Sequence, residues 1–392
     1  MEQNAPRLRF PQFTAAWGKK ALGEIIKEYD KRTSKDNEDI LLSCTTGGIF
    51  LNSDIFSHQR GKSTKGYKKV SLNTLILSAQ NLHLGNANVN FKFKSGIISP
   101  AYNTYEIAKE NPIFISEWIK TKAFYAIVNK CSSIGASACR RNIEWTNLYK
   151  SIIRIPSLPE QEKIADFFTA LDEKIEAKEK KIEEVKTLKK GFLQQLFPQE
   201  GETVPRLRFP GFSGVWEKKK MGEIVQRKSK KGISDFQTPS VEYEDINAKE
   251  GTLNKNIYNK MTGKEGILFD KDDIVYGKLR PYLGNWINPT FTGVAVGDFW
   301  VLKPKAKLAK GFVYYLIQGT KFQKIANQST GTKMPRADWK LIANTIFAVP
   351  SLPEQEKIAD FFSALDEKIE AMEKQRDALK AMKKGFLQQM FI

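Results

Sequence analysis

Apolar residues recur at alternating intervals of three and four along two stretches of the chain. This heptad spacing is typical of a coiled-coil seam, with charged residues on the remaining helix faces. Lys178 interrupts the first seam and Arg376 interrupts the second, and polar residues at such positions lower stability while they fix register and partner. The apolar seam positions are Phe168, Leu171, Ile175, Ile182 and Val185 in the first stretch, and Phe362, Leu365, Ile369, Met372 and Leu379 in the second.

The two stretches are near copies of each other. Residues 157–197 and 351–391 are identical at 31 of 41 positions, and each follows directly on Pro156 or Pro350. A Ser-x-x-Glu capping box with a proline in the first turn predicts a helix from the start of each copy. A helix of nearly forty residues is roughly 60 Å long at 1.5 Å per residue, longer than a small domain is wide. We therefore expect the two helices to pack together, most simply in antiparallel orientation.

A glycine interrupts each predicted helix near its end, at Gly191 and Gly385. Glycine in a helix marks either the close approach of another element or a break. The sequence leaves both readings open.

The chain before each repeat differs in sequence but shows one order of elements twice. Alternating apolar runs predict strands, longer runs with helical period predict helices, and a short apolar strand leads into each repeat. The pattern indicates one mixed scaffold that carries two different sets of surface residues. The predicted strands are residues 69–79 and 91–99, and residues 266–279 and 293–304 are predicted as strands linked by turns. The predicted helices are residues 112–130 and 310–327, and the loops are residues 132–145 and 328–339.

These patterns together predict an α+β protein with an internal two-fold tandem repeat. Two mixed α/β domains are separated by two long helices that form an antiparallel coiled coil. The phrase P-R-L-R-F-P at Pro6 recurs at Pro205 and leads into each domain. The expected segments are a first domain at 1–155 with its lead-in at 1–13, a helix at 156–197, a linker at 198–212, a second domain at 213–349 and a second helix at 350–392.

The formal net charge of +19 lies in the segments that are not repeated. Residues 14–155 hold 21 Lys and Arg against 11 Asp and Glu, and residues 213–349 hold 23 against 13. The repeated helices are close to neutral. Two basic domains on neutral connectors indicate one polyanion bound at two places. General basicity that serves solubility is the alternative interpretation.

Candidate nucleic-acid contacts follow from side-chain chemistry. Arginine can bond the O6 and N7 atoms of guanine, and lysine can hold phosphate. Each residue could also be an ordinary solvated side chain, so the basic loops are stronger candidates than their members. The candidates are Lys62, Lys65, Lys68, Lys69, Arg140 and Arg141 in the first domain, and Lys228, Lys230, Lys231, Lys278, Arg280, Tyr282, Lys333 and Arg336 in the second.

No catalytic or metal-binding motif is complete in the sequence. The tetrapeptide at residues 288–291, N-P-T-F, has threonine where an amino-methyltransferase needs a second proline, so it is expected to be a turn. No phosphate-binding Walker sequence is present, and the acidic cluster at residues 270–273 is expected to be a solvated turn. Three cysteines and two histidines lack metal-ligand spacing. We expect no catalytic, cofactor-binding or metal site and a soluble protein of the reducing cytoplasm.

The doubled P-S-L-P-E-Q-E-K-I-A-D-F-F phrase, each copy followed by a long helix, resembles the specificity subunit of type I restriction–modification systems. The fragment G-T-K-M-P-R-A-D-W at residues 331–339 is also similar to that family's approach to the helix. The resemblance covers the whole chain as architecture. It implies that each variable domain is a target-recognition domain for half of a split, asymmetric double-stranded DNA site, and that the helices set the spacing of the halves.

The resemblance also implies partners. Two methyltransferase subunits would dock around the helices, and restriction subunits would join them. S-adenosylmethionine, ATP and Mg²⁺ would be bound by those partners and not by this chain. Adjacent phenylalanines cannot both face a narrow seam, so Phe167 and Phe361 are the candidate docking residues, with burial in the neighbouring domain as the alternative.

Two other functions stay open on the sequence alone. The chain could be a stand-alone DNA methyltransferase or nuclease with an unusual motif. It could also be a non-catalytic scaffold whose basic domains bind nucleic acid or protein.

Overall fold

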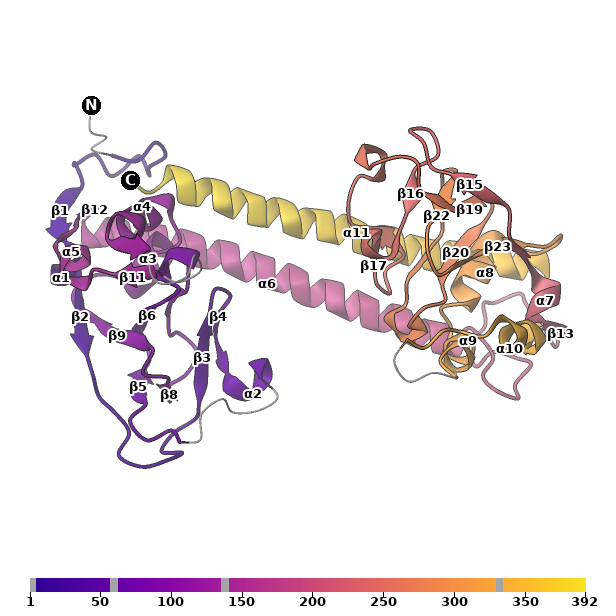
Figure 1. Ribbon diagram of the computed structural model, residues 1–392, viewed down its shortest axis with the longest axis horizontal. Helices are drawn as coiled ribbons and strands as arrows, with labels where there is room; N and C mark the ends of the chain where they lie inside the picture. The colour runs from indigo at the N-terminus through magenta and orange to yellow at the C-terminus, as the bar shows by residue number, and fades with distance from the viewer. Residues whose placement is uncertain (1–4, 57–62, 135–140, 329–333) are drawn as a thin grey trace. The chain divides into compact units, whose positions relative to one another are not determined.

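The computed structural model describes residues 5–56, 63–134, 141–328 and 334–392 (Figure 1). It divides into two compact units, Met1–Glu179 with Lys374–Ile392, and Lys180–Glu373. Each unit contains one mixed domain, one end of each long helix, and its own hydrophobic core.

The domain of the first unit is built on a four-stranded antiparallel sheet of order β2-β9-β6-β7. Smaller antiparallel pairs surround it, β1 with β12, β3 with β4, β5 with β8, and β10 with β11. The bounds are β1 Gly18–Ala21, α1 Leu22–Ile25, β2 Ile26–Tyr29, β3 Leu42–Thr45, β4 Gly48–Leu51, α2 Asn52–Ile55, β5 Lys68–Ser71, β6 Leu75–Ser78, η1 Leu82–Leu84, β7 Ala87–Val89, β8 Ser95–Ile98, β9 Tyr102–Ile107, α3 Pro112–Trp118, α4 Lys122–Lys130, β10 Ser132–Ile134, β11 Arg141–Ile143, α5 Trp145–Lys150 and β12 Ile152–Ile155.

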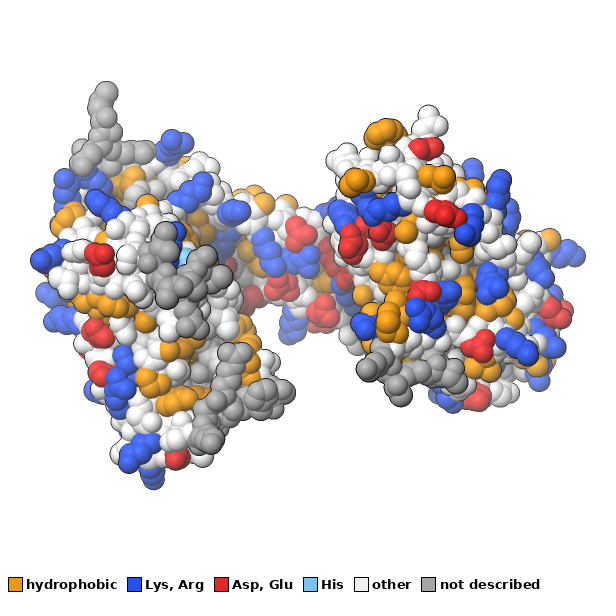
Figure 2. Space-filling view, in the orientation of Figure 1, with side chains coloured by type: hydrophobic (Ala, Val, Ile, Leu, Met, Phe, Trp, Pro, Cys, Tyr) orange, Lys and Arg blue, Asp and Glu red, His pale blue; other side chains and the backbone are white. Residues whose placement is uncertain are grey.

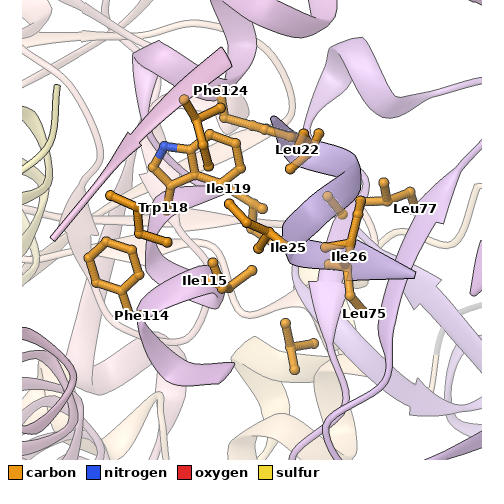
Figure 3. Close-up of a cluster of buried hydrophobic side chains, with 14 of the residues drawn as sticks. Leu22, Ile25, Ile26, Leu75, Leu77, Phe114, Ile115, Trp118, Ile119 and Phe124 are labelled. Carbon is orange, nitrogen blue, oxygen red and sulfur yellow. The ribbon is translucent and has the colours of Figure 1, made fainter. Parts of the chain in front are cut away.

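The core of this domain lies between the sheet and helices α1, α3 and α4. Figure 3 shows Leu75 and Leu77 of β6 on the sheet side and Phe114 and Trp118 of α3 on the helix side. All four side chains are at most 2% exposed. Burial of large apolar side chains, each stabilising by roughly 1.5–3 kcal/mol, holds the helices on the sheet.

The domain of the second unit repeats this plan. The corresponding four-stranded antiparallel sheet has the order β14-β23-β20-β21, and helices α8 and α9 occupy the sequence positions of α3 and α4. A second four-stranded sheet has the order β15-β19-β22-β16, with β16 parallel to β22. The bounds are β13 Glu217–Lys220, α7 Met221–Ile224, β14 Val225–Lys228, β15 Lys231–Ile233, β16 Ser240–Val241, η2 Tyr243–Asp245, β17 Ile246–Asn247, β18 Thr252–Leu253, η3 Ile257–Asn259, β19 Glu265–Phe269, β20 Ile274–Gly277, η4 Pro281–Leu283, β21 Trp286–Ile287, β22 Gly293–Ala295, β23 Phe299–Pro304, α8 Lys310–Leu316, α9 Thr320–Ala326, α10 Trp339–Asn344 and β24 Ile346–Val349.

The repeats form the two long helices, α6 Leu158–Gln195 and α11 Leu352–Gln389, each of 38 residues. In the first unit the Lys383 ammonium lies 2.6 Å from Asp172 of α6. In the second unit Lys189 lies 2.5 Å from Asp366 of α11. Each contact joins the beginning of one helix to the end of the other, so the predicted antiparallel pairing is confirmed.

Most apolar seam positions are buried. In the first unit Phe168, Leu171 and Ile175 are at most 7% exposed, and in the second Ile182, Val185, Phe362 and Ile369 are at most 8% exposed. Leu365, Met372 and Leu379 are half-buried. The polar interruption in α6 bonds the other helix, since Lys178 Nζ donates to Gln375 Oε1 at 2.9 Å.

The two helix glycines mark neither a break nor a crossing. Both helices continue through Gly191 and Gly385. A Cβ added at either position would meet no described atom within 4 Å. Both sequence interpretations were therefore wrong.

Several predicted elements are shorter than the sequence pattern suggests. The helix expected at residues 112–130 is two helices, because Thr121 adopts extended backbone and its hydroxyl accepts a hydrogen bond from the Phe124 N–H as the N-cap of α4. The strand expected at residues 69–79 is two strands of different sheets, β5 and β6, joined by a turn with Asn73 in the left-handed region at φ 63°. Asparagine tolerates that conformation better than most residues.

The repeated P-R-L-R-F-P lead-ins connect the ends of the two long helices. In the first unit Leu8 N–H donates to Gln389 O of α11, and the Arg9 guanidinium forms two 2.7 Å hydrogen bonds with Glu160 of α6. Arg208 repeats the bidentate contact with Glu354 of α11 in the second unit. Both glutamates are at most 2% exposed. The carboxylates expected in capping boxes are therefore bound by arginine.

Candidate nucleic-acid interface

The strongest candidate site is the turn that joins β20 to β21 in the second domain. Two segments that the sequence identified separately meet here. The Arg280 N–H donates to Pro335 O at 2.7 Å, and the Ala337 N–H donates to Lys278 O at 2.8 Å. An isolated bridge pairs Leu279 with Arg336. The fold thereby places four predicted contact residues in one cluster, Lys278, Arg280, Tyr282 and Arg336.

A half-buried network of hydrogen bonds and ion pairs fixes the base of this turn. The Tyr243 hydroxyl donates to Asp298 O at 2.6 Å and accepts from the Leu279 N–H at 3.0 Å. The Asp298 carboxylate is bound by Arg336 at 2.8 Å and by Lys278 at 3.3 Å. Burial alone would raise the pKa of Asp298, but the hydrogen bonds from the two cations outweigh it and hold the pKa below its usual value. The Asp298 carboxylate therefore neutralises one of the three positive charges of the cluster, which are those of Lys278, Arg280 and Arg336.

Arg280 stands apart from this network. Its backbone is in the left-handed region at φ 47°, immediately before a proline. That conformation costs a non-glycine residue roughly 1–2 kcal/mol, and such strain concentrates at binding sites. The Arg280 side chain is exposed, as are Tyr282 and Met334, which are 53% and 50% exposed. A cation, an aromatic ring and an apolar side chain are therefore presented together.

In the first domain Arg141 lies beside the corresponding turn, which joins β6 to β7. Its guanidinium donates to Asn129 Oδ1 at 3.1 Å and to Ser132 Oγ at 3.4 Å. Burial lowers the pKa of His83 in η1, and the positive charge of Arg141 lowers it further. The imidazole is therefore favoured in its neutral form at pH 7, with one nitrogen as donor and one as acceptor.

The remaining predicted cations differ in exposure and in whether they form ion pairs with acidic residues of their own domain. Lys65 and Lys230 are exposed, and Lys231 is exposed while paired with Glu265 at 2.8 Å. Lys68 is 4% exposed, and Lys69 is bound by Glu38, whose pKa its hydrogen bond lowers to about 2. Lys62, Arg140 and Lys333 lie outside the described residues.

Lys228 and the acidic cluster at 270–273 form one structural unit. The Lys228 ammonium lies 3.0 Å from Asp270 and 2.5 Å from Asp273, which is fully buried. The cluster is the turn between β19 and β20 as expected, but it is held by a cation and is only partly solvated. On the face seen in Figure 2, basic side chains of this domain alternate with acidic and apolar ones.

Phe167 and Phe361 are half-buried and already contact aromatic rings of their own units. The Phe167 ring centroid lies 6.0 Å from that of Phe10 and 5.0 Å from that of Phe386. The Phe361 ring lies 5.0 Å from Phe192 and 5.5 Å from Phe209. Part of each side chain stays accessible, so docking is left as a prediction.

The sequence reading missed the polar residues of the β6–β7 turn, Gln80, Asn81 and His83. They occupy the positions that Leu279, Arg280 and Tyr282 occupy in the second domain. The signal was present, because both turns end in the tripeptide Leu-Gly-Asn, at residues 84–86 and 283–285. Tyr243 and Asp298 were also missed, and no local pattern marks them.

Two findings concern the described residues as a set. Within the described ranges, no three His, Cys, Asp or Glu side chains are grouped as metal ligands. No helix among those ranges is long and apolar enough to cross a membrane.

Comparison with known proteins gives consistent matches along the chain. The family model described as type I restriction modification DNA specificity domain matches residues 17–187 and 214–381. The type I restriction enzyme MjaVIII specificity subunit of Methanocaldococcus jannaschii is 25% identical over 357 residues, covering 82% of this chain and 80% of that protein. The EcoDI specificity subunit of Escherichia coli is 22% identical over 327 residues, covering 74% and 71%. The crystal structure of a type I restriction–modification S subunit from M. genitalium has a TM-score of 0.57 at 16% identity and covers 99% of both chains.

Proposed function

Because the chain belongs to the type I restriction–modification DNA specificity family, we propose that it recognises a bipartite, asymmetric DNA site and directs partner subunits to it. The observation that carries the proposal is the duplicated sheet, β2-β9-β6-β7 and β14-β23-β20-β21, with different side chains on equivalent turns. Two domains that share one fold but carry different residues on equivalent turns can bind two half-sites of different sequence. The excess positive charge of both domains supports binding to a polyanion.

In this proposal the chain itself is non-catalytic. Two methyltransferase subunits and, in the full complex, restriction subunits carry the chemistry, with S-adenosylmethionine, ATP and Mg²⁺ bound on those partners. The exposed faces of α6 and α11, with the accessible parts of Phe167 and Phe361, are the proposed docking surface for the methyltransferase subunits. The complex would act in the cytoplasm, where its DNA is. Methyl transfer by this chain alone, with labelled S-adenosylmethionine and DNA, would favour the stand-alone enzyme instead.

The spacing of the half-sites provides the direct test. Two domains on paired helices of fixed length should read half-sites about one DNA turn apart, roughly 34–36 Å. We expect methylation by the complex of this chain with its methyltransferase partner to be lost when the spacer grows by several base pairs. A spacer lengthened by one complete helical turn is the matched control, because it changes the distance between the half-sites but not their relative rotation about the DNA axis. Unchanged methylation of all lengthened sites would contradict the proposal that the helices set the distance.

Salt dependence separates DNA binding from a protein scaffold. Each phosphate contact steepens the slope of log K against log salt by about 0.9. Lys230 is exposed beside β15, so Lys230→Ala is expected to make the slope shallower by about 0.9. Lys218→Ala, an exposed lysine of β13 in the same domain, is the control and should leave the slope unchanged. If the affinity of the wild-type protein for duplex DNA does not change with salt concentration, the scaffold function is favoured.

A further inference from the structure

We propose that the turns at residues 79–85 and 278–284 are the base-reading turns of the two domains, with Asn81 reading an A·T pair and Arg280 reading a G·C pair. The inference rests on the proposed function and adds the residues that select the sequence.

The two turns are equivalent in the fold. Each follows the third strand of its four-stranded sheet, passes through a single turn of 3₁₀ helix, η1 or η4, and enters the edge strand β7 or β21. Each ends on a left-handed glycine, Gly85 at φ 89° and Gly284 at φ 71°, followed by a buried asparagine. These asparagines, Asn86 and Asn285, are 8% and 6% exposed. The closing residues of the turn are thus the same in both domains.

The side chains that these turns present are different. Asn81 and Arg280 occupy the position immediately before the 3₁₀ helix, and both are exposed. Across the described parts of the chain, neither side chain is held by a hydrogen bond or an ion pair. Lys278 and Arg336, in contrast, are bound to Asp298. A side chain that no described residue binds keeps its bonding capacity for a ligand.

The backbone beneath these side chains is fixed. In the first domain the Asn81 N–H donates to Ser78 Oγ at 3.1 Å, and Asn81 O accepts from Leu84 N–H at 3.0 Å. In the second domain the Arg280 N–H donates to Pro335 O, and Tyr243 holds the neighbouring Leu279 N–H. A rigid backbone reduces the ordering entropy lost on binding, which favours discrimination between similar ligands.

The chemistry of the two side chains assigns the base pairs. An amide can bond adenine N6 and N7 together, and a guanidinium can bond guanine O6 and N7 together. The two turns share their place in the fold and their closing Leu-Gly-Asn, so the difference between asparagine and arginine would change the base that each domain selects. Neighbouring His83 and Tyr282 can add contacts from the same turn.

The test is the methylated sequence of DNA from cells that carry this chain with its methyltransferase partner. We expect Asn81→Ala to relax one A·T position in one half-site only, and Arg280→Ala to relax one G·C position in the other half-site only. Discrimination at the affected position should fall roughly tenfold to a hundredfold. Lys218→Ala is the control and should leave the motif unchanged.

Arg280→Gly guards against a folding defect, because glycine adopts φ 47° without strain. It should relax the same position as Arg280→Ala while the protein remains fully folded. An unchanged motif in the alanine variants, or weakening that is uniform over all sequences, would overturn the inference. If the wild-type complex has no sequence preference, the proposed function itself fails, before any variant is considered.

Discussion

Phe362→Ala is expected to lower the free energy of unfolding of the second unit by about 3–5 kcal/mol. The Phe362 ring is fully buried where α11 meets the second domain. Its centroid lies 4.9 Å from the ring of Tyr315 and 6.2 Å from the ring of Phe197. Removal of the ring leaves a cavity among residues from α8, α11 and the segment that follows α6, which can relax only partly.

Hydrogen exchange followed by mass spectrometry can assign this loss to one unit, because opening is measured segment by segment. Protection of β20 and β23 should fall in Phe362→Ala, and protection of β6 and β9 should fall in the equivalent variant Phe168→Ala. Phe168 is also fully buried and lies 6.0 Å from Phe391. Met382→Ala, at a side chain that is 50% exposed, is the control and should change stability by at most about 0.5 kcal/mol. Loss of protection spread equally over both units would mean that they unfold together.

The long helices could be predicted from sequence because their signal is local and repeated. Heptad spacing at Phe168, Leu171 and Ile175 requires only that one helix face be buried, and that face is buried in the structure. The break at Thr121 could not be predicted in the same way. The apolar run continues on both sides of Thr121, and the N-cap hydrogen bond from the Phe124 N–H to its hydroxyl is established only by the structure.

The sequence predicted several members of the candidate site but not that they meet. Arg280 and Arg336 were identified as basic loop residues, whereas their meeting depends on a hydrogen bond from Arg280 to Pro335 across 55 positions of chain. Asn81 carries no charge, so the only sequence signal for its turn was the tripeptide Leu-Gly-Asn that both turns share. The role that we propose for Asn81 rests on the equivalence of its turn with that of Arg280, which the strand order of the two sheets defines.

The arginine–glutamate pairs of the lead-ins are expected to contribute unequally, although their sequences repeat. Arg208→Met leaves the Glu354 carboxylate, which is 2% exposed, without its cation. Loss of one partner from a buried ion pair costs about 3–5 kcal/mol. In the first unit Glu160 also accepts a hydrogen bond from the Trp17 indole N–H at 3.1 Å. The equivalent indole N–H of Trp216 is buried and bonds no described residue.

Arg9→Met should therefore cost less than Arg208→Met, by about 1.5–3 kcal/mol, the value of a hydrogen bond to a charged group. Urea unfolding followed by the fluorescence of the tryptophans can compare the two variants. Trp17→Phe combined with Arg9→Met should remove the difference, since it makes the first unit resemble the second. Glu354→Gln combined with Arg208→Met should recover much of the lost stability, because it removes the unpaired buried charge. Equal costs for the two single arginine variants would show that the Trp17 hydrogen bond does not stabilise the carboxylate.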